Sequence, residues 1–156
     1  KTWLLEHLVS ILAGAGVRAA VIKHDGHEFE ADVPGTDSHR MKKAGAFGTV
    51  VYSGTRFALV KDQAGLEARD FFGYFPEADI LLLEGQKNSA YPKIEVLRQE
   101  ISCSPVCSPE TVLAYVADCQ VSQQGSREPR QVFAFDQLDE VAELAIHHMD
   151  AVFFKN

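Results

Sequence analysis

Two short apolar runs, each ending in charged residues, constrain the fold of this chain more than any other feature. The first covers residues 17–23 and leads into His24 and Asp25, and the second covers residues 79–83 and leads into Glu84. Continuous apolar runs of this length are typical of strands that are buried on both faces, as in parallel sheets. Because ligands of open α/β sheets bind at the carboxyl ends of the strands, the acids at these ends indicate a ligand site.

Helical and strand patterns alternate along the rest of the chain. Apolar residues recur at three- and four-residue steps over residues 2–13, which predicts a helix, and Asp37-Ser38 can cap a second one. The other expected elements are a hairpin over 47–52 and 56–61, a helix over 66–74, strands over 94–97, 111–117 and 132–135, and a last helix over 136–149. The alternation predicts one α/β domain, a mostly parallel sheet with helices on both faces and an inserted β-hairpin.

The composition is that of an ordinary globular domain with an acidic balance. The chain has 156 residues, of which 46% are hydrophobic, and a net charge of -7 from 15 Lys+Arg against 22 Asp+Glu. This acidic balance disfavours a general DNA- or RNA-binding surface, which is normally basic. No apolar run approaches the roughly 20 residues that are needed to cross a bilayer. We therefore expect neither a nucleic-acid partner nor a membrane segment.

The cysteines indicate a reducing compartment. Their number, three, is odd, whereas a secreted disulfide framework normally uses an even number. Cys103 and Cys107 are four residues apart and Cys119 lies alone downstream, so a zinc site would lack a fourth ligand. We expect three reduced thiols in a cytosolic protein.

Lys1 and Thr2 match the end of a phosphate-binding loop of the form G-x-x-x-x-G-K-[ST]. In that loop glycine N–H groups hold the phosphates, the lysine reaches the terminal ones, and the hydroxyl binds Mg²⁺. A predicted helix begins directly after the pair and a predicted strand follows, as the motif requires. An ordinary helix can also begin with these two residues. We expect a domain over residues 1–156 that lacks its first strand and glycine loop, since a strand before Lys1 would complete a βαβ unit.

A loop rich in acids, glycine and proline follows the first predicted strand, over residues 25–36. Its Asp32, together with Glu84, is a candidate ligand of a nucleotide-bound Mg²⁺, because such sites place carboxylates at or beyond strand ends. Either acid can equally be a helix cap or a solvated loop residue. Gly35 lets the backbone turn close to a ligand, and Arg40 on the next helix can make a bidentate phosphate contact.

Together these motifs resemble one family, the molybdopterin-guanine dinucleotide biosynthesis protein B (MobB) family of P-loop GTP-binding proteins. The similarity runs from residue 1 to about residue 98, with the motifs in family order. The stretches that carry it are Lys1-Thr2, Lys23-His24-Asp25-Gly26-His27, Asp32-Val33-Pro34-Gly35-Thr36-Asp37-Ser38, Arg40, Ala44-Gly45-Ala46, Leu83-Glu84-Gly85 and Pro92-Lys93-Ile94-Glu95.

The resemblance implies a single domain of the P-loop NTPase type that binds GTP and Mg²⁺. It implies at most slow GTP hydrolysis, and no catalytic residue is assigned. The implied protein is a cytoplasmic adaptor of molybdenum cofactor biosynthesis that is usually a homodimer. Its implied partners are the guanylyltransferase that attaches GMP to molybdopterin, and molybdopterin itself.

The resemblance also implies roles for individual residues. Lys1 would contact the β/γ-phosphates, and Thr2 would hold Mg²⁺. Asp32 and Gly35 would form a D-x-x-G element that senses the γ-phosphate, with Asp32 near the metal. Glu84 would be a further acid beside the ion.

Some positions depart from the family pattern. Trp3 stands where a small or hydroxyl residue is more usual, and Thr36 stands where the family often has lysine. The chain has no N-K-x-D motif for reading guanine. Asp118, which follows the predicted strand over 111–117, is our candidate for that role.

Two other functions are compatible with these residues. A small-molecule kinase would need an acceptor pocket with its own base, such as Asp25 or Asp32, and an arginine-rich lid. The chain has no arginine-rich stretch, which counts against a kinase. An interaction domain that no longer binds nucleotide is the third hypothesis, because the sequence shows no glycines before Lys1.

Overall fold

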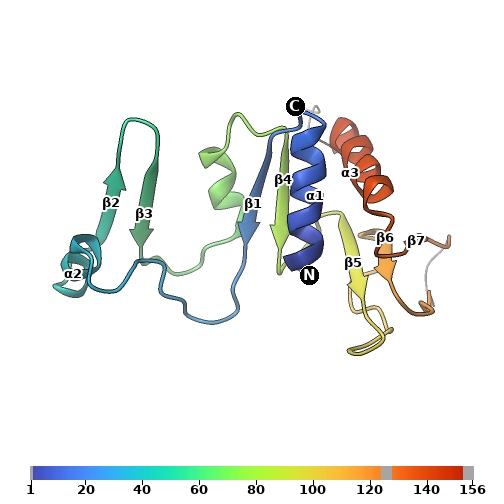
Figure 1. The fold of residues 1–156 in the computed structure, drawn as a ribbon. Helices are drawn as coiled ribbons and strands as arrows, with labels where there is room; N and C mark the ends of the chain where they lie inside the picture. Colours follow the sequence, from blue (N-terminus) through green and yellow to red (C-terminus); the bar gives the residue numbers. More distant parts are fainter. Residues whose placement is uncertain (1, 124–127, 153–156) are drawn as a thin grey trace.

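The structure, a computed structural model, describes residues 2–123 and 128–152. Its elements, in chain order, are α1 (Thr2–Gly14), β1 (Ala19–Lys23), α2 (Asp37–Lys43), β2 (Gly48–Tyr52), β3 (Phe57–Lys61), the 3-10 helix η1 (Ala68–Tyr74), β4 (Ile80–Glu84), β5 (Lys93–Leu97), β6 (Val112–Ala117), β7 (Gln131–Phe133) and α3 (Leu138–Val152) (Figure 1). The predicted α/β class, the parallel strands and the inserted hairpin are confirmed. No helix of these described residues is long and apolar enough to span a membrane.

The described strands form three separate sheets. β1 pairs in parallel with β4, so that Ala19 lies opposite Ile80 and Lys23 lies opposite Glu84. β5, β6 and β7 form a second parallel sheet in that order, and β2 pairs with β3 in an antiparallel hairpin. In Figure 1 the arrows of β1, β4, β5 and β6 all point toward the end of the molecule where α1 begins.

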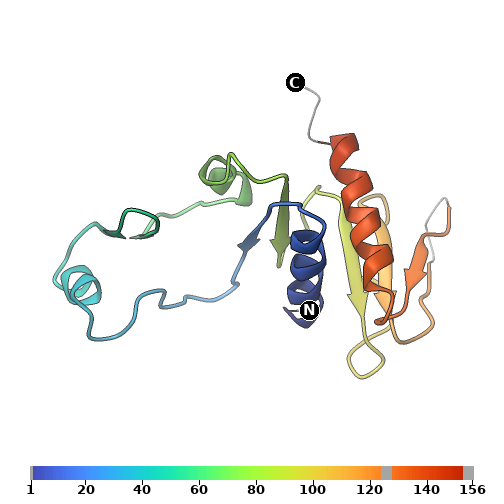
Figure 2. The same ribbon diagram turned by 45° about the horizontal axis from the view of Figure 1, so that its top comes forward.

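The main core lies between α1, α3 and the parallel strands. Leu4, Leu8 and Leu12 are buried, and their four-residue spacing places them on one face of α1. This face packs with Val141 of α3 and Ile80 of β4 in one apolar cluster. α1 and α3 lie side by side over the strands (Figures 1 and 2). The packing therefore fixes the start of α1 beside the carboxyl ends of the strands.

A smaller apolar cluster lies on the other face of β6. Ala114 and Val116 belong to the main core, whereas the alternate residues Tyr115 and Ala117 belong to the smaller cluster. Cys107, from the loop after β5, packs against the smaller cluster. Burial raises the pKa of the Tyr115 phenol, and the nearby Glu95 carboxylate raises that pKa further. Loop residues thus help to cover this face of the sheet.

α2 and the β2–β3 hairpin stand apart from the main core (Figures 1 and 2). α2 packs against β2, and Lys42 of α2 forms an ion pair with Asp62 beyond β3. The N-cap of α2 is Thr36, whose hydroxyl accepts a hydrogen bond from His39 N over 3.4 Å. The expected cap at Asp37-Ser38 was therefore one to two residues late, because these residues are already helical.

Arg18 and Asp79 join the amino ends of β1 and β4. Arg18 Nη2 donates to Asp79 Oδ1 over 2.8 Å, Arg18 Nε donates to Oδ2 over 3.0 Å, and the backbone N of Arg18 donates to Oδ2 over 2.8 Å. These hydrogen bonds lower the pKa of the Asp79 carboxyl from 3.8 to about 2. The charged form of Asp79 therefore stabilises the folded state.

We expect acid to remove this stabilisation. A carboxyl whose pKa is lower in the folded state stabilises the fold above its unfolded pKa, and the stabilisation is lost as the pH falls from 3.8 toward 2. Asp79→Asn should flatten the pH dependence of the free energy of unfolding in this range, measured by urea denaturation. The exposed loop acid Glu28 supplies the control Glu28→Gln. An unchanged slope in Asp79→Asn would contradict the prediction.

Candidate functional site

The candidate site is the edge at which the parallel strands end and α1 begins (Figure 1). Thr2 is the first residue of α1, and Glu84 is the last residue of β4 and is half-buried. The predicted phosphate ligand Lys1 lies outside the described residues. A helix N-terminus with a hydroxyl residue, next to a strand that ends in a carboxylate, is the arrangement that the sequence predicted for a nucleotide–Mg²⁺ site.

The chain segments that follow β1 and β4 touch at this edge. His24 N donates a hydrogen bond to Glu84 O over 2.9 Å. Gly85 has a φ of +88°, and a Cβ at this position would lie 2.5 Å from His24 O. Only glycine is compatible with both conditions, because other residues disfavour this φ and carry a Cβ. Through their backbones, Glu84 and Gly85 therefore hold the segment after β1 against the segment after β4 at this edge.

Asp32 and Gly35 form a tight turn before α2. Asp32 Oδ1 accepts hydrogen bonds from Val33 N over 2.9 Å and from the Thr36 hydroxyl over 3.3 Å. Asp32 Oδ2 is buried and has no hydrogen-bond partner within the described part of the chain. Gly35 has a φ of +89°, which glycine adopts readily. An unpaired buried carboxylate oxygen is a place for a donor or a cation.

The structure shows a role for His39 that the sequence did not indicate. Its side chain is among the few buried polar groups, with 9% of the residue exposed. Its Nδ1 accepts a hydrogen bond from Gly35 N over 3.2 Å, so the proton is on Nε2, which lies 2.9 Å from Glu30 Oε1. His39 thus fixes the turn that contains Asp32.

The predicted ligands after β1 do not all meet at the start of α1. The segment over residues 24–36 leads from the end of β1 to α2, away from α1 (Figures 1 and 2). Arg40 of α2 is exposed, with its Nη1 3.9 Å from Asp37 Oδ1. In residues 2–123 and 128–152, no group of three or more His, Cys, Asp or Glu side chains is arranged to hold a metal. The nucleotide and metal roles of Asp32 and Arg40 stay predictions.

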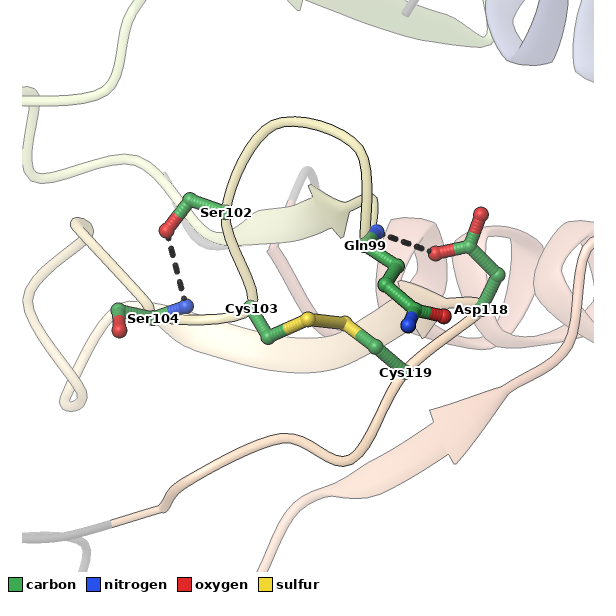
Figure 3. The surroundings of a disulfide bond; sticks show 6 residues. All are labelled: Gln99, Ser102, Cys103, Ser104, Asp118 and Cys119. Atoms are coloured by element: carbon green, nitrogen blue, oxygen red, sulfur yellow. Dashed lines mark hydrogen bonds between the residues drawn. A yellow bond between two sulfur atoms is a disulfide. The ribbon is translucent and has the colours of Figure 1, made fainter.

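The carboxyl ends of β5 and β6 are joined at the same edge. Asp118 directly follows β6, and its Oδ1 accepts a hydrogen bond from Gln99 N over 2.7 Å (Figure 3). Cys103 and Cys119 form a disulfide beside this contact, with a Cα–Cα distance of 6.1 Å. The expectation that all three thiols are reduced is therefore wrong. Cysteine number and spacing do not reveal that the loop after β5 folds back onto the end of β6 and brings Cys103 to Cys119.

Two further polar side chains, those of Glu95 and Lys93, hold loops in this region by hydrogen bonds. The sequence predicted neither role. Glu95 of β5 is 6% exposed, and its Oε1 accepts hydrogen bonds from Val106 N over 2.7 Å and from Cys107 N over 3.3 Å. Lys93 Nζ donates to Tyr91 O over 2.8 Å and to the Thr111 hydroxyl over 3.3 Å. The Pro-Lys-Ile-Glu stretch therefore fastens loops to the sheet.

Comparison with known proteins agrees with these motifs. The family model described as "Molybdopterin guanine dinucleotide synthesis protein B", MobB, matches residues 1–118. The chain belongs to this family. The resemblance that the sequence motifs indicated is thereby confirmed.

Curated relatives match 63–65% of this MobB-family chain. The molybdopterin-guanine dinucleotide biosynthesis adapter protein of Escherichia coli (strain K12) is 37% identical over 103 residues, which are 63% of this chain and 59% of that protein. The protein of the same name from Haemophilus influenzae is 34% identical over 105 residues, which are 65% of this chain and 59% of that protein. The chain thus spans about 59% of the length of these relatives.

Solved structures share the fold of this MobB-family chain. The crystal structure of Bacillus subtilis MobB has a TM-score of 0.68 and 25% identity, and the match covers 92% of this chain and 90% of that one. A crystal structure of molybdopterin-guanine biosynthesis protein B has a TM-score of 0.66 and 21% identity, and the match covers 94% and 91% of the two chains. The likeness extends beyond residue 98, where the motif similarity weakened.

We expect loss of the disulfide to destabilise the protein. The bridge spans 16 residues of sequence, and closing a loop of about this length is worth about 3 kcal/mol in the unfolded-chain model. Cys119→Ser should lower the free energy of unfolding by about that amount. A reducing agent should destabilise the parent protein and leave Cys119→Ser unchanged, in urea denaturation.

Cys107 supplies the control for this experiment because it lies outside the bridge. Cys107→Ser should keep its sensitivity to the reducing agent. Alkylation of all three thiols in the folded, unreduced protein, detected by mass spectrometry, would contradict the disulfide.

Proposed function

We propose that this chain is a GTP-binding adaptor in the biosynthesis of molybdopterin-guanine dinucleotide, acting in the cytoplasm. The observation that carries the proposal is the position of Thr2, at the start of α1 and at the carboxyl edge of the parallel strands. Lys1 and Thr2 match the end of a phosphate-binding loop, which requires this place in an α/β fold. The curated relatives are named adapter proteins of this biosynthesis, which supports the pathway.

The residues fit the chemistry of Mg²⁺. Thr2 and Glu84 at this edge, and Asp32 in the turn before α2, offer hydroxyl and carboxylate oxygens, which are the ligands that this ion prefers, and a shared ion requires residues 24–36 to approach α1. The buried Oδ2 of Asp32, which has no hydrogen-bond partner among the described residues, is suited to a cation or to a water bound to one. Mg²⁺ in nucleotide sites takes one or two carboxylates beside phosphates and water, so a cluster of protein acids is not required. When bound, the ion would neutralise charge on the phosphates.

The protein's own groups would bind phosphate by electrostatics. Lys1 and the free N–H groups at the start of α1 favour an anion there. The N–H of Gly35 donates to His39 Nδ1 over 3.2 Å, and a γ-phosphate would have to compete with that acceptor. Residues 25–38 would then differ in how well they are ordered between the states with and without a bound γ-phosphate. No residue is a strong candidate for positioning an attacking water, so hydrolysis is slow in this proposal.

Asp118 is the proposed contact for the guanine base. It lies exposed at the carboxyl end of β6, and Gln99 N holds its Oδ1. The other carboxylate oxygen remains able to accept hydrogen bonds, and guanine presents N–H donors on its edge. Arg40 is proposed as a phosphate contact, which requires α2 to approach α1.

The β2–β3 hairpin is the proposed surface for a second copy of the chain. Val50 lies opposite Leu59, and Tyr52 lies opposite Phe57, so the four side chains share one face of the hairpin. All four are exposed, and Tyr52 is 80% exposed. A two-stranded hairpin is marginally stable alone, and a contiguous apolar patch marks an interaction site. The homodimer that the family resemblance implies would cover this face.

Charged substitutions in the hairpin test the proposed dimer surface. Tyr52→Asp and Phe57→Asp each place a carboxylate in the apolar face, and burying an unpaired charge is costly. We expect both variants to be monomers in analytical ultracentrifugation at concentrations where the parent is a dimer. Ile101→Asp changes an exposed apolar residue outside the hairpin and should remain a dimer. Dimers of unchanged affinity in both hairpin variants would contradict the proposed surface.

The nucleotide proposal is tested by binding to the full natural chain, measured by calorimetry with Mg²⁺. We expect GTP to bind more tightly than ATP. Lys1→Ala should weaken GTP binding by about tenfold to a hundredfold, since it removes a hydrogen bond from a charged donor to phosphate. Lys87→Ala, which changes an exposed lysine after β4, should bind GTP like the parent.

The same measurement separates the alternative functions. An ATP preference, with phosphate transferred to an added small molecule, would indicate a kinase. Negligible binding of both nucleotides by the parent would refute the GTP proposal and leave an interaction domain. The adaptor's proposed partners are the molybdenum cofactor guanylyltransferase and molybdopterin, and pull-down of the purified guanylyltransferase with the parent protein tests the first.

A further inference from the structure

An aromatic and guanidinium cluster joins three separate elements at the site edge. Trp3 is in the first turn of α1, Arg98 directly follows β5, and Phe135 lies just beyond β7. The ring centroids of Trp3 and Phe135 are 6.2 Å apart, and the Arg98 guanidinium carbon lies 4.9 Å from the centroid of Phe135. His7, one turn along α1, supports Trp3 with a ring separation of 4.3 Å.

The Trp3 side chain of this cluster is exposed, whereas Phe135 and Arg98 are half-buried. Trp3 is 41% exposed, although its ring is the largest apolar side chain available to cover a core. In residues 2–123 and 128–152, Arg98 has no ion-pair partner for its guanidinium. A guanidinium that stacks on an aromatic ring keeps its N–H donors in its own plane, at the rim of the stack. The cluster therefore combines exposed ring surface with unused donors.

Two residues of the cluster are sequence neighbours of residues at the two ends of the proposed nucleotide site. Trp3 follows Thr2, the proposed Mg²⁺ ligand. Arg98 precedes Gln99, whose N–H holds Asp118, the proposed guanine contact. A base attached to phosphates at the start of α1 and turned toward Asp118 would therefore pass over this cluster.

We propose that Trp3 forms the stacking platform for the guanine base, with the Phe135 ring tilted against it by 53°, and that Arg98 contacts the O6/N7 edge of the base. The inference rests on the proposed GTP site and assigns its base-specificity residues. Aromatic side chains stack on nucleobases irrespective of sequence, because every base has a π-face. An arginine donates to both O6 and N7 of guanine, whereas adenine presents an N6 amino donor in place of O6. Arg98 thus supplies a preference for guanine that the missing N-K-x-D motif does not.

Trp3 gives this inference a direct optical test, because it is the one tryptophan of the 156 residues. In the presence of Mg²⁺, GTP should quench the tryptophan fluorescence of the protein. Trp3→Phe lacks this fluorescence and serves as the control that the signal comes from Trp3. Inorganic triphosphate carries the phosphates without the base, so we expect it to bind without this quenching. The full natural chain is used, and binding is followed independently by calorimetry.

Substitutions separate stacking from phosphate binding. Trp3→Ala should weaken GTP binding by about tenfold and leave triphosphate binding unchanged, because stacking involves the base alone. Trp3→Phe should retain most of the GTP affinity. Tyr74→Ala, which removes an exposed aromatic ring from η1, is the matched control. Thermal unfolding establishes that each variant is folded.

Arg98 has its own readout, the ratio of GTP to ATP affinity. Arg98→Ala should lower this ratio by about tenfold, the discrimination expected of one bidentate contact to guanine. Arg69→Ala, on η1, should leave the ratio unchanged.

The outcomes distinguish this inference from the proposed function. If GTP binds the parent but Trp3→Ala and Arg98→Ala bind it with parental affinity and selectivity, the platform is refuted and GTP binding stands. Equal weakening of GTP and triphosphate by Trp3→Ala would show that Trp3 only positions the phosphate end, and would also refute it. If neither GTP nor triphosphate binds the parent, the proposed function fails and the platform fails with it.

Discussion

The packing of α1 against α3 and the strands is the interaction on which the rest of this structure depends. Leu4, Leu8 and Leu12 are buried in the main core, and each leucine buried in this way contributes about 1.5–3 kcal/mol. This apolar stripe fixes the helix axis across the sheet. Its first turn, with Thr2 and Trp3, is thereby held at the carboxyl edge of the strands, where charged and aromatic side chains are available.

The second half of the edge is organised by polar and covalent links across the loop after β5. Glu95 accepts backbone hydrogen bonds from Val106 and Cys107, Asp118 holds Gln99, and Cys103 is bonded to Cys119. These links place Arg98 beside Phe135. Disulfides of cytosolic proteins are usually transient or redox-sensing, so the cytoplasmic location proposed above would link the redox state of this bridge to the position of Arg98.

The β2–β3 hairpin and α2 are not held together by a buried apolar core in the part of the chain that the structure describes. Their apolar residues, such as Tyr52 and Phe57, remain exposed, and the unit is held through contacts such as the Lys42–Asp62 ion pair. The Asp32 turn, fixed by His39, lies at the junction between this unit and β1. A partner that covers the hairpin would therefore act close to the predicted γ-phosphate sensor.

The sequence by itself determined the elements, the α/β class and the family, because periodicity, turn residues and motifs are local properties of the chain. The leucine spacing of α1 and the apolar run of β4 predicted both elements to within about one or two residues, as expected for such signals. Tertiary structure decided which distant side chains meet. It paired Cys103 with Cys119 and buried Glu95 and His39. It carried Arg40 away from α1 and brought Trp3 and Arg98 to Phe135. These outcomes depend on the path of the loops, which no local pattern records.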